Sequence, residues 1–133
     1  GEWSSNLSIE NIHEFDLYQS GDGAWTSSFT EWKIYDVKLC LEISIYPEEG
    51  DQHEGLCIWL HTSKYSENLI KIFQDTKIQE FLKDNNFENE SEDNILVYTK
   101  YFDIDITYEN VESLSVEWVN KLKPIIEIIA ALS

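Results

Sequence analysis

Residues 33–46 read Lys-Ile-Tyr-Asp-Val-Lys-Leu-Cys-Leu-Glu-Ile-Ser-Ile-Tyr and decide the fold of this chain. From Val37 onward every second residue is valine, leucine or isoleucine, whereas the residues between them are mixed in character. Such an alternation is typical of a β-strand that turns one face to a core. We therefore predict a half-exposed strand over residues 33–46, of the kind found in antiparallel sheets.

A second strand is predicted at residues 56–62, after the polar and acidic connection from Pro47 to Gly55. Two alternating runs around a glycine-bearing loop are typical of a hairpin. The residues expected to face the core are Leu56, Ile58 and Leu60, and those expected on the other face are Cys57, Trp59 and His61.

Two cysteines, Cys40 and Cys57, fall on the more polar face of this predicted hairpin. A hairpin folded near Gly50 places Cys57 opposite roughly residues 44–46, about two diagonal steps from Cys40 and outside disulfide range. We therefore expect free thiols, which are typical of a reducing compartment, and a cytoplasmic location. The sequence contains neither an apolar stretch of transmembrane length nor a recognisable signal peptide, so no membrane contact is expected.

Residues 66–85 have the apolar spacing of a helix, either as two short helices or as one bent helix. Ser66 can cap the first segment, and Thr76 with Gln79 forms a candidate capping box for the second. Residues 84–94 are acidic and rich in asparagine, which predicts a loop.

A third strand is predicted over residues 95–107, followed by a last helix that begins near Ser113 or Ser115 and ends near Ala131. Pro124 removes one backbone donor, so the helix should kink near Asn120. The run from Ile125 to Ile129 is apolar nearly all round, which fits either a buried helix or a homodimer contact.

Residues 1–30 show no clear period, apart from a turn at residues 20–23 and a loop or strand entry at residues 26–28. Taken together, the patterns predict a single acidic α+β domain over residues 1–133. Its architecture would be a small antiparallel sheet of at least three strands with two to four helices packed on it, one of them C-terminal.

The charge of the chain narrows its range of partners. There are 26 acidic residues against 9 lysines and no arginine, for a formal net charge of −17. A surface this acidic repels nucleic acid and anionic membranes and attracts basic proteins. Aromatic residues make up 14% of the chain, which is enough for a core and argues against a disordered acidic segment.

Few residues suggest catalysis or cofactor binding. His13, His53 and His61 lack the spacing of metal ligands, and the acidic loops lack the spacing of a calcium-binding loop. Cys57 and His61 are about 13 Å apart along one strand, too far for a thiol to be activated directly. We expect no catalytic residues, no metal and no cofactor.

The sharpest enzymatic pattern is Asp36-Val37-Lys38, preceded by Asp16 or Asp22. It resembles the D…(D/E)xK core of the restriction-endonuclease-like nucleases, and Glu31-Trp32-Lys33 fits the same pattern. The resemblance covers only these few residues and implies carboxylates that hold Mg²⁺ and a lysine that polarises water. The negative field of the chain argues against DNA as its substrate.

Three acidic segments and two aromatic residues are the candidate partner-binding residues, because carboxylates around aromatic anchors suit an interface with a basic protein. They are Glu48, Glu49, Asp51 and Glu54; Glu88, Glu90, Glu92 and Asp93; Asp103 and Asp105; and the aromatic residues Trp59 and Tyr46.

The sequence thus favours a non-enzymatic acidic inhibitor that binds a basic protein. The expected role is that of an immunity-type protein that neutralises a nuclease toxin or another nucleic-acid-binding protein by occlusion. The first alternative is a DNA mimic that blocks a restriction or other defence system, and the second is a Mg²⁺-dependent nuclease using Asp36 and Lys38. Acidic segments that meet beside Trp59 and Tyr46 would favour the inhibitor.

Overall fold

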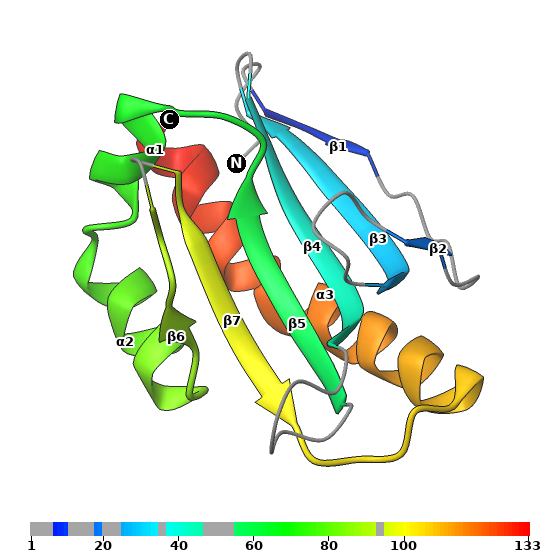
Figure 1. Cartoon of the computed structure of the whole chain (residues 1–133). Helices are drawn as coiled ribbons and strands as arrows, with labels where there is room; N and C mark the ends of the chain where they lie inside the picture. The colour runs from blue at the N-terminus through cyan, green and yellow to red at the C-terminus, as the bar shows by residue number, and fades with distance from the viewer. Residues whose placement is uncertain (1–6, 11–17, 20–24, 35–36, 47–54, 93–94) are drawn as a thin grey trace.

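The computed structural model describes residues 7–10, 18–19, 25–34, 37–46, 55–92 and 95–133 (Figure 1). It has an α+β fold, as predicted, with a sheet in front of a long helix. The elements in chain order are β1 Leu7–Glu10, β2 Tyr18–Gln19, β3 Trp25–Ile34, β4 Val37–Tyr46, β5 Gly55–Thr62, α1 Glu67–Ile72, α2 Thr76–Asp84, β6 Glu88–Asn89, β7 Val97–Phe102 and α3 Tyr108–Leu132.

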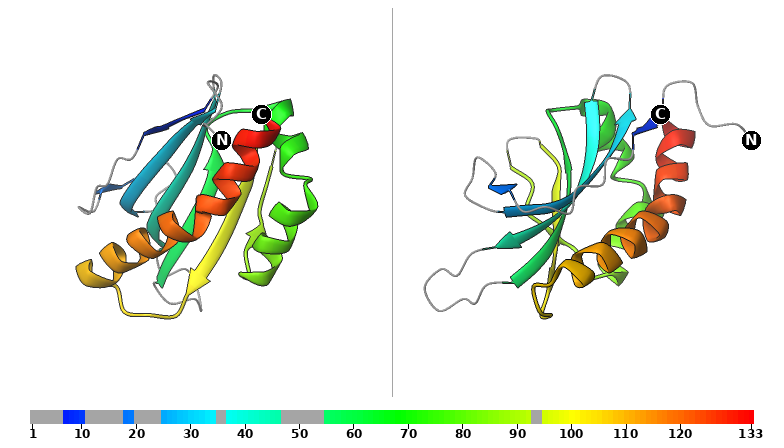
Figure 2. Two further views of the ribbon diagram at one scale, coloured as in Figure 1. Left: turned by 180° about the vertical axis from the view of Figure 1, so that it is seen from behind. Right: turned by 90° about the vertical axis from the view of Figure 1, so that its right-hand side faces the viewer.

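The strands form one sheet in the order β1-β3-β4-β5-β7-β6, with β2 also paired to β3. Every strand pair in it is antiparallel, which confirms the predicted sheet type. α3 crosses one face of this sheet, as both views in Figure 2 show. α2 lies beside α3, since the Phe81 and Trp118 rings meet edge to face at 6.4 Å.

The predicted hairpin of β4 and β5 is confirmed in its register. Leu41 lies opposite Leu60 and Ile43 opposite Ile58, and all four side chains are buried in the core. Cys57 lies opposite Ser44, within the range predicted from the sequence. Both cysteines are free thiols.

The structure differs from the prediction in the region before Val37, where a separate strand, β3, ends at Ile34. The predicted strand over residues 33–46 contains the end of β3 and all of β4, with residues 35–36 outside the described part. The core face of β3 begins with Ser28 and Thr30, which are each 1% exposed, so the apolar alternation is absent there. A register shift between Thr26 and Ser28 disturbs the pattern further.

The helical region divides into two short helices. Ser66 caps α1, as predicted, by accepting a hydrogen bond from the Leu69 backbone amide. The predicted capping box of Thr76 and Gln79 is wrong, because Asp75 is the N-cap of α2 and its carboxylate accepts from two backbone amides. Thr76 is already inside the helix.

β7 and α3 differ from the prediction at their shared boundary. β7 ends at Phe102 rather than residue 107, and α3 begins at Tyr108 rather than near Ser113. The helix begins early because the Thr107 side chain accepts from the Asn110 backbone amide and caps it. β6 lies in the region predicted to be a loop.

Pro124 lies inside α3, and the helix changes direction along its length in the right-hand view of Figure 2. Ile125, Ile126 and Ile129 are each at most 3% exposed and pack into the core. The apolar run therefore forms part of a buried helix face. Among the described residues, no helix is both long and apolar enough to cross a membrane.

Candidate functional site

The candidate site is the sheet face opposite α3, together with its β6 edge, and this face is turned to the viewer in Figure 1. Within the described part of the chain, no helix covers it. One cross-strand row runs over it in the order Glu88, Thr99, Trp59, Glu42 and Phe29. Residues directly opposite one another in a sheet present their side chains to the same face, so this row places acidic residues on both sides of Trp59.

The row is compact, but its members differ in exposure: Thr99 is buried and the Glu42 side chain is only 15% exposed. Adjacent strands lie about 4.8 Å apart, so the backbone of Glu42 is one strand spacing from Trp59 and that of Glu88 is two. Trp59 is partly exposed and Glu88 is exposed. The accessible part of the row is therefore the Trp59 side chain together with the Glu88 carboxylate.

A third acidic residue, Glu90, is held next to this row. The Tyr101 hydroxyl lies 3.1 Å from each carboxylate oxygen of Glu90 and donates its hydrogen to that carboxylate. Burial raises the pKa of Tyr101 above its usual range, and the hydrogen bond to Glu90 and the charges of Glu90 and Glu88 add to this effect. The tyrosine therefore stays protonated and keeps the Glu90 carboxylate close to the sheet.

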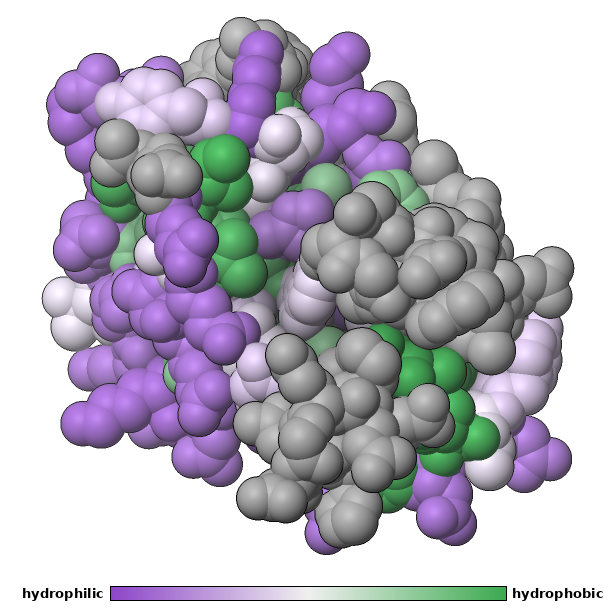
Figure 3. Space-filling view, viewed as in Figure 1, coloured by the Kyte–Doolittle hydropathy of each residue, from purple (hydrophilic) through white to green (hydrophobic). Residues whose placement is uncertain are grey.

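The structure brings together some of the predicted partner-binding residues. Glu88 belongs to the row through Trp59, and Glu90 is held beside it by Tyr101. Glu92, also exposed, forms an isolated bridge with Ile95 further along. Figure 3 shows hydrophilic residues gathered over α1, α2 and β6 on the side of this face. Within the described part of the second acidic segment, Glu88 is the residue that shares the cross-strand row with Trp59.

Other predicted residues lie apart from this row or outside the described part. Asp103 and Asp105 are exposed in the connection from β7 to α3, beyond the end of the sheet. The backbone of Tyr46 pairs with Gly55 at the end of the hairpin. The predicted residues that lie outside the described part are Glu48, Glu49, Asp51, Glu54 and Asp93.

Sequence reasoning missed Glu42 and Tyr101. Glu42 lies directly opposite Trp59, and its Oε1 atom is 3.5 Å from Nε2 of His61. The signal was present, because Glu42 and Trp59 both fall on the polar faces of the two predicted strands. Extending the predicted hairpin register from Cys57 would have paired them.

The residues of the nuclease-like pattern are only partly described. The Lys38 amino group lies 3.1 Å from a Glu31 carboxylate oxygen, and that glutamate side chain is 9% exposed. Asp16, Asp22 and Asp36 lie outside the described residues. Among the described residues, no three side chains of His, Cys, Asp or Glu are grouped as a metal site requires.

Cys40 and His61 form a pairing that the sequence analysis did not consider, because the register places them directly opposite each other on β4 and β5. A thiol beside an imidazole is a candidate nucleophile when it ionises easily. Here burial, followed by the charges of Glu31 and Glu42, raises the pKa of the Cys40 thiol to about 12. The thiol is therefore protonated at neutral pH, which argues against nucleophilic chemistry.

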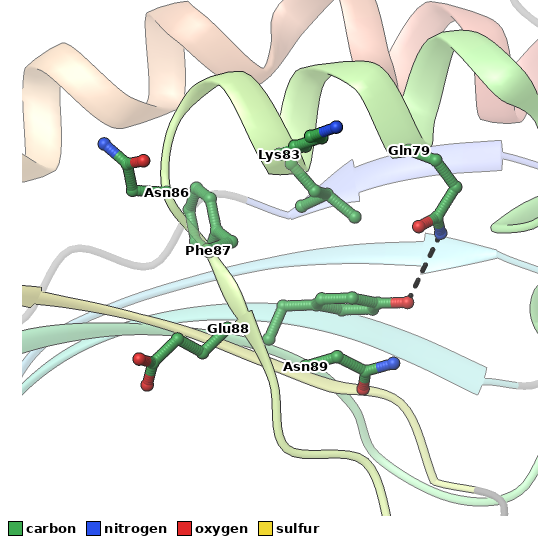
Figure 4. A pocket seen from close by; sticks show the side chains of 8 residues that line it. Gln79, Lys83, Asn86, Phe87, Glu88 and Asn89 are labelled. Atoms are coloured by element: carbon green, nitrogen blue, oxygen red, sulfur yellow. Dashed lines mark hydrogen bonds between the residues drawn. The ribbon is translucent and has the colours of Figure 1, made fainter.

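A pocket of about 390 Å³ lies between α2 and the β6–β7 edge (Figure 4). The Gln79 side-chain amide donates to the Phe73 carbonyl and lies 3.4 Å from the Tyr98 hydroxyl, so its hydrogen bonds stay within the protein. Glu88 and Lys83 are the charged residues that line this pocket. The residues that line it are Gln79, Leu82, Lys83, Asn86, Phe87, Glu88, Asn89 and Tyr98.

Lys83 lines the pocket beside Glu88, whereas Lys71, Lys100 and Lys121 make their contacts elsewhere. Residues 39–63, 84–99 and 101–120 contain no basic residue other than histidine. Lys71 and Lys121 pair with glutamates four residues earlier on their own helices. Lys100 projects to the helix side, where its amino group lies 2.6 Å from the Asn85 carbonyl and 5.8 Å from the Trp118 ring.

The chain matches no protein-family model, no curated protein and no solved structure. The functional argument therefore rests on the residues and their arrangement.

Proposed function

We propose that this chain is an acidic protein-binding inhibitor of the immunity type. It would neutralise a basic nuclease toxin, or another nucleic-acid-binding protein, by covering the surface with which that protein binds nucleic acid. The observation that carries the proposal is the row in which Glu42 and Glu88 lie on either side of Trp59. Aromatic anchors surrounded by complementary charge are typical of tight protein interfaces.

The proposed mechanism has two stages. The long-range negative field accelerates the encounter with a basic surface, because electrostatic steering raises association rates. Trp59 then enters a hollow on the partner, while Glu88 and Glu90 pair with lysine or arginine at its rim. Loss of the aromatic anchor should mainly raise the dissociation rate, whereas loss of rim charge should mainly lower the association rate.

The placement of the lysines supports this mechanism. No lysine lies in residues 39–63 or 84–99, which include β5, β6 and most of β4. On this face Glu31 is paired with Lys38, and Glu42 lies 3.5 Å from His61. Glu88 and Glu90 have no lysine within their own segment, and a basic partner would supply cations to them.

The proposed place of action is the cytoplasm. Both cysteines are buried free thiols, and free thiols are typical of a reducing compartment. A nuclease inhibitor in that compartment would act beside the nucleic acid that it protects.

The test begins with capture of a binding protein by the full chain from an extract of the organism that encodes it, at low and at high salt. The captured protein is identified, purified and assayed for nuclease activity with increasing amounts of the full chain. The proposal predicts a basic protein that is retained at low salt and whose activity falls to zero at about one equivalent. Retention of no basic protein at low salt would refute it, and displacement of duplex DNA from a non-nuclease defence protein would favour the DNA mimic instead.

A further inference from the structure

The connection between β7 and α3 exposes apolar side chains that the fold does not bury. Ile104 is 41% exposed, Ile106 36% and Tyr108 58%. These three lie within five consecutive residues, whereas the other large exposed apolar side chains of the described chain are more widely spread. Exposed apolar groups gathered beside charged residues mark interaction surfaces more often than isolated ones do.

The same segment is strongly acidic. Asp103, Asp105 and Glu109 alternate with the exposed apolar residues, and all three are exposed. Residues 101–120 contain no lysine and no arginine. We define the anchor strip as Asp103, Ile104, Asp105, Ile106, Tyr108 and Glu109.

The anchor strip is fixed in place by the start of α3. The Asn110 side-chain amide donates to the Asp105 carbonyl at 2.8 Å, and its backbone amide donates to the Thr107 hydroxyl at 3.0 Å. The Val111 backbone amide donates to the Thr107 carbonyl at 3.1 Å. A segment ordered in this way loses less conformational entropy on binding than a free loop does.

The anchor strip lies at the end of the sheet where the hairpin strands also meet. Phe102, the last residue of β7, pairs with Leu56, and Gly55 next to it pairs with Tyr46. In Figure 1 the connection runs from the lower end of β7 across to α3. It is therefore separate from the row through Trp59, which crosses the middle of β5.

From this geometry we infer that the anchor strip docks a protein surface with an apolar groove bordered by lysine or arginine. This inference rests on the proposed function and assigns a second contact to the same partner. The isoleucines would fill the groove and the aspartates would pair with its basic border. A second copy of this chain would bring acidic residues against the acidic anchor strip, and nucleic acid would bring negatively charged phosphates. Both would be repelled, so charge complementarity favours a basic protein surface.

The inference can be tested without the natural partner, using two synthetic peptides of equal length and equal lysine content. One alternates lysine with leucine, and the other alternates lysine with serine. Binding of each labelled peptide to the full chain is measured by fluorescence anisotropy at low and moderate salt. We expect the lysine–leucine peptide to bind roughly tenfold tighter or more, because burying one leucine side chain contributes about that factor.

Substitutions then locate the binding. Ile104→Ser with Ile106→Ser should remove the preference for leucine, and Asp103→Asn with Asp105→Asn should weaken both peptides and flatten the salt dependence. Val116→Ser is the matched control, since Val116 is 56% exposed on α3 outside the anchor strip, and it should change neither. Circular dichroism confirms that each variant keeps its fold.

The possible failures are distinguishable. If the full chain binds neither peptide at low salt, binding to basic partners is refuted, and the proposed function is refuted with it. A full chain that binds both peptides equally, or a serine double variant that keeps the leucine preference, would refute only the anchor strip.

Discussion

Trp59 on β5 lies directly opposite Glu42 on β4, on the sheet face away from α3. Glu42 also approaches His61 at 3.5 Å. The aromatic side chain that we propose as an anchor is thus carried by a strand that is paired on both sides, with β4 and with β7. An anchor on a rigid strand binds with a smaller loss of entropy than one on a loop.

Replacement of Trp59 by alanine should weaken partner binding by about 2 kcal/mol or more, which is roughly a thirtyfold loss of affinity. The dissociation rate measured by surface plasmon resonance should account for most of it. Tyr65→Ala is the control, because Tyr65 is an aromatic residue that is 53% exposed after the end of β5. Equal losses for the two variants would argue against Trp59 as an anchor.

The excess of negative charge should make stability depend on salt. With a formal net charge of −17, the surplus carboxylates repel one another in the compact state, and salt screens that repulsion. We expect the melting temperature, followed by circular dichroism, to rise from low to moderate ionic strength. A melting temperature that does not change with salt would show that the charges are too dispersed to matter.

Cys40 should make stability decrease at high pH. Burial raises the pKa of its thiol from 9.0 to about 12, so the folded state favours the protonated form. Its contribution to the free energy of unfolding is complete below pH 9.0 and is lost as the pH rises toward about 12, because only the unfolded chain ionises in that window. Urea titrations across this range should show a shallower decline for Cys40→Ala than for the wild type, and equal slopes would contradict the assignment.

Ser28 and Ser115 link the sheet to α3 through a buried hydrogen bond of 2.9 Å between their hydroxyls. Replacing Ser115 alone by alanine removes this acceptor of the Ser28 hydroxyl, so the free energy of unfolding should fall by about 1–3 kcal/mol. The double replacement of both residues should cost less than the sum of the single ones. Additive losses in a urea-denaturation double-mutant cycle would show that the two hydroxyls do not interact.

The nuclease alternative has a direct test in Lys38, whose amino group lies 3.1 Å from Glu31. The inhibitor proposal predicts that the purified chain does not cleave DNA with Mg²⁺ present. Cleavage that depends on Mg²⁺ and disappears in Lys38→Ala would establish the nuclease. Lys77→Ala is the control, since Lys77 is an exposed lysine on α2 outside both matches to the nuclease pattern.

The hairpin of β4 and β5 could be predicted from the sequence because its core face is apolar at every position and its register follows from the connection. β3 was missed because Ser28 and Thr30 occupy its core face. The third strand was predicted too long because Ile104 and Ile106 continue the alternation beyond Phe102, where no described strand pairs with them. Apolar alternation signals a strand only where a neighbour supplies hydrogen bonds.

The candidate site was harder to predict than the fold. Glu88 reaches the row through Trp59 only by way of β6, which has two residues and no sequence pattern of its own. The pairing of Cys40 with His61 depends on the same kind of long-range register. The composition of the chain was enough to predict an acidic surface. The neighbours of each carboxylate could not be predicted, because they depend on how strands distant in the sequence pair with one another.

The measurement that tests the central claim most directly compares two variants with equal net charge. Glu88→Gln with Glu90→Gln neutralises exposed carboxylates beside Trp59, and Glu67→Gln with Glu80→Gln neutralises exposed ones on α1 and α2. Association rates with the captured basic protein are measured at low salt by stopped-flow fluorescence. The proposal predicts that the first variant associates several-fold more slowly than the second. Equal rates for the two variants would contradict it, because association would then depend on the net charge of the chain and not on the position of Glu88 and Glu90 beside Trp59.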